Sequence, residues 1–166
     1  MAEGTTPQSP RPPEDRDLIA LCRELNTQGA KYLVVGGMAV IQQGFLRATE
    51  DIDLLVQRSE ANRQAIVRAL EMLPGKSARE ITELDFRDYT VVRVVDELMI
   101  DLMMAACGLS YEDAIQDAET VTIEGVPIPF ASAETLWKMK QTYRDKDEID
   151  RFFLQRLLAE REKRST

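Results

Sequence analysis

The stretch from Leu33 to Val56 constrains the fold of this chain more than any other. It begins with a short β-branched run that ends in Gly36 and Gly37, continues through a helix-like segment, and then alternates acidic with apolar residues. Such alternation is strand periodicity, so Asp51 and Asp53 should project from one face while the apolar residues beside them fill the other. Two neighbouring carboxylates repel each other unless a cation or a solvated cleft relieves the repulsion. The pattern therefore predicts that something is bound at this strand.

Each half of this pattern has a simpler explanation when it is taken alone. An Asp-x-Asp pair is more often a solvated strand end than a metal site, and any tight turn from a strand into a helix favours glycine. The combination is more specific. Glycines at such a junction let a phosphate approach the N–H groups at the helix start. Paired acids nearby can hold the Mg²⁺ ions that phosphates carry.

The run Val35-Gly36-Gly37 is followed by thirteen residues and then by Asp51-Ile52-Asp53-Leu54. This spacing resembles the signature of the DNA polymerase β-like nucleotidyltransferase superfamily, in which a hydrophobic-Gly-Gly turn precedes an Asp-x-Asp strand. Arg47 and Thr49 extend this motif to Arg-x-Thr-x-Asp-Ile-Asp, which most resembles the motif of the small bacterial and archaeal members. These include toxin-type enzymes of abortive-infection and toxin–antitoxin systems. The motif resembles that of the aminoglycoside and lincosamide nucleotidyltransferases more distantly. The resemblance extends from about residue 18 to residue 158.

The resemblance implies an α/β (α+β) fold with a mixed, partly antiparallel sheet flanked by helices. It implies transfer of a nucleoside monophosphate from a nucleoside triphosphate to a hydroxyl acceptor, with release of pyrophosphate and dependence on Mg²⁺ or Mn²⁺. Asp51 and Asp53 would then be metal ligands and catalytic residues. The nucleotide-binding residues would include Gly36, Gly37, Arg47 and Thr49.

A third candidate ligand is Asp101, the single acid in the apolar run from Leu98 to Met104. A lone carboxylate in a buried strand is costly unless it is paired or bound to a metal. The superfamily carries its third metal-site acid on a later strand, so the resemblance gives Asp101 this metal-binding and catalytic role. Asp96 and Glu97 are instead expected to form the turn of a hairpin.

The C-terminal third of the chain adds to the resemblance. Lys140, Arg144, Lys146-Asp147 and Asp150 follow a pattern similar to the tail of the small single-domain nucleotidyltransferases. The resemblance implies that Lys140 contacts the triphosphate, whereas the residues alone are equally consistent with a surface lysine. Arg144, Asp147 and Asp150 are expected to join the last two helices through ion pairs.

Composition excludes several other kinds of chemistry. The chain contains no histidine, which rules out Ser-His-Asp and Cys-His catalysis, histidine-ligated zinc and imidazole bases. Carboxylates, lysines and arginines must carry any reaction, as in magnesium-dependent phosphoryl transfer. The net charge of −8 disfavours non-specific binding to long nucleic acids. The basic residues near the C-terminus could still bind a triphosphate or an RNA end.

Length and terminal composition predict the organisation of the chain. Its 166 residues suffice for one nucleotidyltransferase domain over residues 14–166, preceded by a Pro/Ser/Thr-rich tail over residues 1–13 that should be disordered. The sequence has no apolar signal-peptide segment and no membrane-length apolar run, so we expect a soluble cytoplasmic protein with no membrane partner. Cys22 and Cys107 each lie in an apolar segment and are expected to be buried thiols.

Hydrophobic periodicity and capping signals predict the order of the elements. We expect strands over residues 32–35, 51–57, 90–95, 98–103 and 120–123. Helices are expected over residues 14–28, 38–43 and 110–118, after the capping residues Ser59 and Ser132, and from residue 145 onwards. Residues 76–88 give no clear pattern. Several large side chains near the C-terminus are expected to face the core, namely Tyr143, Ile149, Phe152, Phe153 and Leu157.

The sequence leaves the acceptor and the biological partner open. A tRNA 3′ end, an antibiotic-like small molecule and a protein side chain are all compatible with the predicted reaction. Because the chain is short, a homodimer or a second chain such as a cognate antitoxin could complete the cleft. The alternative function is a catalytically silent module that binds a nucleotide or a regulatory partner.

Overall fold

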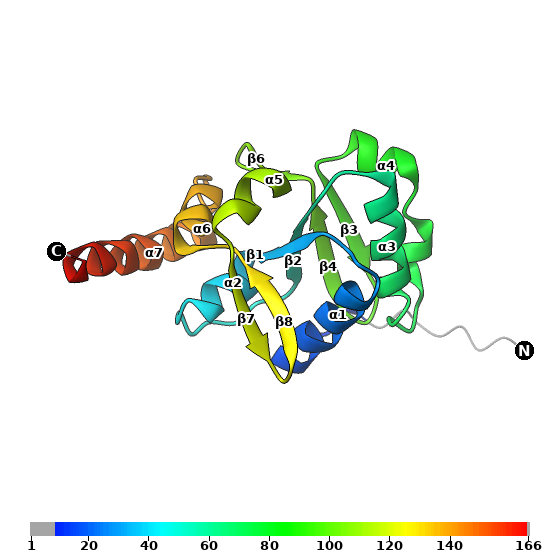
Figure 1. Cartoon of the computed structure of the whole chain (residues 1–166), viewed down its shortest axis with the longest axis horizontal. Helices are drawn as coiled ribbons and strands as arrows, with labels where there is room; N and C mark the ends of the chain where they lie inside the picture. The colour runs from blue at the N-terminus through cyan, green and yellow to red at the C-terminus, as the bar shows by residue number, and fades with distance from the viewer. Residues whose placement is uncertain (1–8, 166) are drawn as a thin grey trace, which may run out of the picture.

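The computed structural model describes residues 9–165 and contains a central six-stranded sheet with helices around it (Figure 1). The strand order is β3-β4-β2-β1-β8-β7. The pairs β2–β4 and β1–β8 are parallel and the other pairs are antiparallel, which confirms the expected mixed α/β sheet. The strands are β1 (Tyr32–Val35), β2 (Ile52–Val56), β3 (Val91–Val95), β4 (Met99–Met103), β7 (Glu119–Ile123) and β8 (Val126–Phe130).

Seven α-helices occur in the described part of the chain, together with two 3₁₀ segments and a small two-stranded sheet. Helix α1 packs against α3 and β8, α2 packs against β1, β2 and α6, and α6 packs against α7. Helix α7 projects from the body of the molecule beside α6 (Figure 1). The α-helices are α1 (Asp15–Thr27), α2 (Gly36–Gln42), α3 (Glu60–Leu70), α4 (Glu83–Asp88), α5 (Tyr111–Ala114), α6 (Ala133–Met139) and α7 (Asp145–Arg164). The short elements are the 3₁₀ segments Ser77–Glu80 and Ile115–Asp117 and the strands β5 (Ala105–Ala106) and β6 (Leu109–Ser110).

The two central strands β1 and β2 form the middle of the core. All four residues of β1 are buried, and β2 is buried except at Asp53, which is half-buried. A strand that is covered on both faces has a nearly continuous apolar sequence, and both of these strands do. The outer strand β3 is largely exposed by comparison. The apolar residues of β2 are therefore packed in the core, and Asp53 is the one residue of this strand that reaches partly towards solvent.

Local signals in the sequence place most helix starts correctly. The Ser59 side chain accepts a hydrogen bond from the backbone of Asn62 and caps α3, and Ser110 forms a capping box with Asp113 at the start of α5. Residues 76–88, which had no clear pattern, form a 3₁₀ turn and then α4, whose capping box joins Thr82 and Asp85. The expected hairpin is confirmed as β3 and β4, with Asp96 in the turn.

The expectation that the large side chains near the C-terminus face the core is wrong for three of them. Tyr143 is fully exposed, and Ile149 and Phe152 are 59% and 61% exposed. The first half of α7 buries Asp147 and Asp150 instead, because these carboxylates have cationic partners on α6 and elsewhere. Phe153 is partly buried and stacks on Phe45, with 4.8 Å between the ring centroids, and Leu157 is also partly buried.

The two cysteines differ in environment. Cys22 is buried as expected, and burial raises the pKa of its thiol to about 12. Cys107 is exposed, which contradicts the prediction, because it lies in the turn between β5 and β6 with a φ of +46°. Its Sγ nevertheless donates to the backbone carbonyl of Met139 at 3.3 Å, so the turn packs beside the end of α6.

The N-terminal segment is attached to the domain before α1 begins. Arg11 pairs with Asp17 at 2.7 Å and with Glu97 at 3.1 Å, and its backbone N–H donates to the carbonyl of Glu97. Residues 1–8 of the expected disordered tail lie outside the described residues. No helix among residues 9–165 is both long enough and apolar enough to cross a membrane.

Candidate active site

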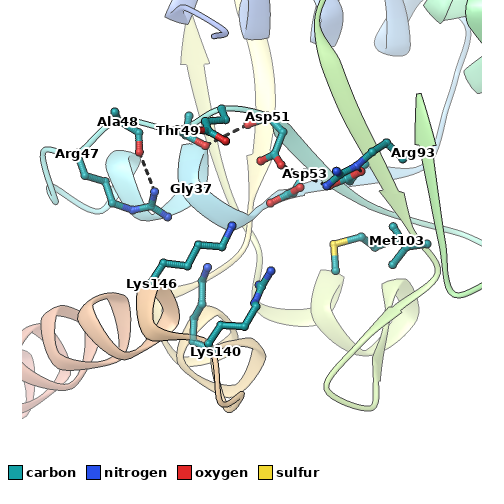
Figure 2. Close-up of a pocket in the computed structure, with 14 residues that line it drawn as sticks. Gly37, Arg47, Ala48, Thr49, Asp51, Asp53, Arg93, Met103, Lys140 and Lys146 are labelled. Atoms are coloured by element: carbon teal, nitrogen blue, oxygen red, sulfur yellow. Dashed lines mark hydrogen bonds and ion pairs between the residues drawn. The ribbon is translucent and has the colours of Figure 1, made fainter. Parts of the chain in front are cut away.

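Three carboxylates meet at one end of the sheet, two from neighbouring strands and one from the residue just before a strand. β2 and β4 are parallel, and their register places Asp53 directly beside Asp101. Asp51 lies just before the start of β2. Oxygen atoms of Asp51, Asp53 and Asp101 all lie within 4.8 Å of one another. The parallel pairing thus brings together the three acids that the sequence singled out, and Figure 2 shows Asp51 and Asp53 on the same side of the site.

The electrostatics of this cluster favour binding of a cation. Burial, followed by the charges of Asp51 and Asp101, raises the pKa of Asp53 to about 7. Burial and then the charge of Asp101 also raise the pKa of Asp51. Carboxylates that resist ionisation together are stabilised by a proton or by a multivalent cation between them. Because every donor is a carboxylate oxygen, the set fits Mg²⁺ or Mn²⁺ and not a soft metal.

The two glycines make room for this cluster. Gly36 has a φ of +65°, and a Cβ atom there would lie 2.0 Å from Asp53 Oδ2. A Cβ atom on Gly37 would lie 2.5 Å from Thr49 Oγ1. Gly37 lines the site cavity, whereas Gly36 is covered by the Asp53 side chain and is not among the lining residues. Both glycines are therefore required by close approach of side chains, whatever the ligand.

The acids form one wall of a cavity of about 520 Å³, and Lys140 and Lys146 lie across it from them (Figure 2). Thr49 also lines the cavity, and its hydroxyl donates to the backbone carbonyl of Asp51 at 3.2 Å. In Figure 2, Lys140 and Lys146 extend from the α6–α7 region towards the acidic strand. A cavity with one acidic and one basic wall suits a ligand that carries both metal ions and phosphates. The basic lining residues are Arg47, Arg93, Lys140, Arg144 and Lys146.

Lys140 is buried and not a surface lysine. Its side chain is 8% exposed, and its Nζ lies 3.1 Å from Asp147 Oδ1 and 3.0 Å from Asp150 Oδ2. Asp150 also accepts a hydrogen bond from Arg47 Nη2 at 2.9 Å. The expectation that Asp147 and Asp150 join the last two helices by ion pairs is therefore confirmed, with Lys140, the C-cap residue of α6, as their partner. The same network connects α7 to the loop before β2.

Arg144, the third residue expected in these ion pairs, pairs instead with Asp147 at the start of its own helix. Its Nε donates to Asp147 Oδ2 at 2.9 Å, and its side chain is 62% exposed. Two buried atoms of the network, Arg47 Nε and Asp150 Oδ1, have no hydrogen-bond partner among the described residues. Arg47 Nε can therefore still donate a hydrogen bond, and Asp150 Oδ1 can still accept one.

Arg93 was missed by the sequence analysis. It lies on β3 directly opposite Asp101 in the antiparallel register. Its Nε and Nη2 atoms bind the two oxygens of Asp101 at 2.7 and 2.9 Å, and Nη2 lies 3.7 Å from Asp51 Oδ2. These hydrogen bonds raise the pKa of Arg93. A signal was present: in the hairpin with its turn after residue 95, the one cation of the run VVRVV faces the one acid of the other arm.

Comparisons with known proteins identify the family of the chain and a structure with a similar fold. A family model described as "Nucleotidyl transferase of unknown function (DUF2204)" matches residues 14–164. Among solved structures, the protein TM1012 of Thermotoga maritima, described as a "putative nucleotidyltransferase", is similar with a TM-score of 0.51 and 17% identity. The similarity covers 87% of this chain and 92% of that chain and shows a shared fold. A search of curated proteins found no match. Because the family model spans almost the whole sequence, the chain belongs to this nucleotidyl transferase family.

Proposed function

We propose that the protein transfers a nucleoside monophosphate from a nucleoside triphosphate to a hydroxyl acceptor, with pyrophosphate as the second product. The observation that carries the proposal is the cavity that sets Asp51, Asp53 and Asp101 against a basic wall. Membership of the nucleotidyl transferase family supports the reaction class. The basic wall supports a polyanionic substrate, and the three carboxylates support a divalent cation as its companion.

Asp51, Asp53 and Asp101 would hold the Mg²⁺ or Mn²⁺ ions. When bound, such ions supply activation of an attacking hydroxyl and neutralisation of charge on a leaving phosphate group. The protein's own contribution is the close spacing of the carboxylates, which the paired strands β2 and β4 fix before any ligand arrives. Preorganised charge of this kind lowers the barrier without reorganisation during the reaction.

The remaining lining residues would bind and orient the triphosphate. Lys146 would offset the charge of the phosphates directly, whereas Arg47 and Lys140 would do so while sharing their charges with Asp150. Gly37 and Thr49 line the cavity where α2 approaches the loop before β2, so the nucleotide would lie against them. A carboxylate oxygen of Asp101 would accept the proton of the acceptor hydroxyl, since the chain has no histidine for this purpose. Arg93 would hold that carboxylate in position.

A catalytically silent nucleotide-binding module is the second candidate. The Arg93–Asp101 pair favours it, because the guanidinium already supplies one positive charge to the acidic cluster. Against it, three close carboxylates remain, and one arginine does not neutralise them. A role in a toxin–antitoxin or defence system, in the cytoplasm and with a cognate antitoxin, is compatible with the transfer reaction.

The proposal is tested with the purified protein, Mg²⁺ or Mn²⁺, and each α-³²P-labelled nucleoside triphosphate in turn. Total RNA, total protein and a small-molecule extract are supplied separately as acceptors. We expect metal-dependent binding of at least one triphosphate by calorimetry, and label transferred to one acceptor fraction with release of pyrophosphate. Binding without any transfer would favour the silent module. Stoichiometric zinc in the purified protein, with no effect of magnesium on nucleotide binding, would overturn the metal assignment.

A further inference from the structure

A second groove, of about 520 Å³, follows the outer edge of β3. All five residues of β3 line it. Successive residues of a strand point to opposite faces, so a groove lined by all five must follow the edge of the strand and not one face. β3 pairs with β4 on one side and has no strand partner on the other among residues 9–165. The groove therefore exposes the edge at which a sheet can accept another strand.

This groove adjoins the cavity that contains the three acids. Val91 and Arg93 line both hollows. The Arg93 guanidinium lies 2.7 Å from Asp101, so the length of one arginine side chain separates the groove from the acidic cluster. A molecule lying along β3 can thus place a group beside the carboxylates without crossing the protein.

The lining of the groove favours a polypeptide over a nucleic acid. Tyr89, Val91 and Val95 expose 60%, 45% and 51% of their surface, which suits apolar side chains. Glu80 and Asp85 line the groove as well, and their carboxylates repel phosphodiesters and attract basic residues. The net charge of −8 on the whole chain likewise disfavours a nucleic acid and favours a basic polypeptide. An open strand edge offers main-chain hydrogen bonds that an extended peptide satisfies and a nucleic acid does not.

We infer that the acceptor is a Ser, Thr or Tyr hydroxyl of a polypeptide that docks as an extended strand along β3. Five residues of strand span about 16 Å, so a segment of about five residues fills the edge. The inference rests on the proposed nucleotidyl transfer. In the reaction the hydroxyl oxygen forms a bond to the α-phosphorus, and the bond between this phosphorus and the bridging oxygen to the β-phosphorus breaks. Pyrophosphate leaves, and the hydroxyl proton passes to a carboxylate and then to water.

The decisive variant is Val95→Lys. Val95 lines the edge groove but not the cavity that contains the three acids, and a lysine on an edge strand blocks the addition of another strand. The matched control is Thr122→Lys, an exposed position on β7 at the opposite edge of the same sheet. Both variants add one positive charge to an exposed edge strand, so charge alone does not distinguish them. Circular dichroism melting verifies that both are folded.

Each protein is incubated with α-³²P-labelled triphosphate and metal, with either nucleic-acid-free total cell protein or total RNA as the probe. We expect protease-sensitive, nuclease-resistant label in protein bands other than the enzyme itself. Val95→Lys should lower this label at least tenfold, while Thr122→Lys leaves it unchanged and neither variant alters triphosphate affinity. Normal labelling of protein by Val95→Lys would overturn docking on β3.

Other outcomes separate the inference from the function on which it rests. Label in RNA, or only in a small-molecule extract, would overturn the polypeptide acceptor and leave nucleotidyl transfer intact. Absence of transfer to any acceptor, despite a folded protein, would overturn the proposed function and the inference with it.

Discussion

The acidic strands and the α6–α7 region supply opposite walls of one cavity, yet they are built in different ways. β2 and β4 lie in the sheet, and their register alone brings Asp53 beside Asp101. Lys140 and Lys146 instead reach the cavity from a helix junction whose position depends on buried ion pairs. The acidic wall is thus fixed by backbone pairing, and the basic wall by side-chain charge. Substitutions should therefore affect chemistry at the first wall, and folding where they break the ion pairs that position the second wall.

The largest expected effect is the loss of transfer in Asp53→Asn. The change removes one charge from the metal-binding cluster and should lower the rate by about a thousandfold or more, roughly 4 kcal/mol in the barrier. The metal-free protein should keep its fold or become slightly more stable, because repulsion from Asp51 and Asp101 is relieved. Pyrophosphate release and thermal melting check both parts. An unfolded Asp53→Asn protein would show that this carboxylate is structural.

Asp150→Asn should have the opposite profile. This buried carboxylate pairs with Lys140 at 3.0 Å and Arg47 at 2.9 Å, and its loss leaves two cations without this partner. Breaking a buried pair in this way typically costs about 3–5 kcal/mol of folding free energy. Arg144→Ala is the control, since its exposed side chain should contribute less than about 1 kcal/mol. Urea denaturation measures both, and equal effects would remove the distinction between the walls.

Lys146→Ala should weaken the binding of triphosphate without unfolding the protein. The exposed Lys146 side chain lines the cavity, and losing a charge-assisted contact costs about 1.5–3 kcal/mol of binding free energy. Lys138→Ala, an exposed position on α6 that does not line the cavity, is the matched control. Calorimetric titration with triphosphate and Mg²⁺ distinguishes them. The same affinity in both variants would remove Lys146 from the site.

The acidic wall should also give the metal-free protein a distinctive pH dependence. The pKa of Asp53 is raised from 3.8 to about 7 in the folded state, so the folded protein holds a proton that the unfolded chain releases. Stability should accordingly fall as pH rises from about 4 to 7, by at most about 1.4 kcal/mol per pH unit. Denaturation at several pH values checks this, and Asp53→Asn should remove the slope. A stability that rises through this range in both proteins would exclude the effect.

The smallest effect is expected for Phe152→Gln. Phe152 is 61% exposed on α7, so its replacement should change stability by less than about 0.5 kcal/mol. Leu154→Ala, two residues further along the same helix at a fully buried position, should cost about 2–5 kcal/mol. Thermal melting of the two variants compares the faces of α7. A large loss in Phe152→Gln would restore the interpretation from sequence that this side chain is core.

The acidic strand and its neighbours were predictable because strand periodicity is local. Alternation placed Asp51 and Asp53 on one face, and Asp101 stood out as the one acid in an apolar run. The contact between Arg93 and Asp101 needed one further step, the register of the hairpin, which its turn determines. Ser59 and Ser110 were predictable as caps for the same local reason.

The faces of α7 were not predictable from periodicity. A helix carrying both aromatic and acidic stripes can bury either one, and the choice depends on its neighbours. Lys140 and Arg47 supply cations at the contact, so Asp147 and Asp150 turn inwards and Phe152 turns out. Lys140 comes from the preceding helix and Arg47 from a loop about a hundred residues earlier. No pattern within α7 itself contains that information.

The space at Gly36 has a consequence for how this sequence can change over generations. Any side chain at Gly36 would collide with Asp53, since even a Cβ atom would lie 2.0 Å from its carboxylate. An alanine there is tolerable only if the aspartate moves or is shortened, and an aspartate that moves leaves the cluster. Gly36 and Asp53, although separated along the chain, are therefore expected to change together in evolution. A substitution of Gly36 alone displaces the Asp53 carboxylate from the cluster, and a substitution of Asp53 alone removes it.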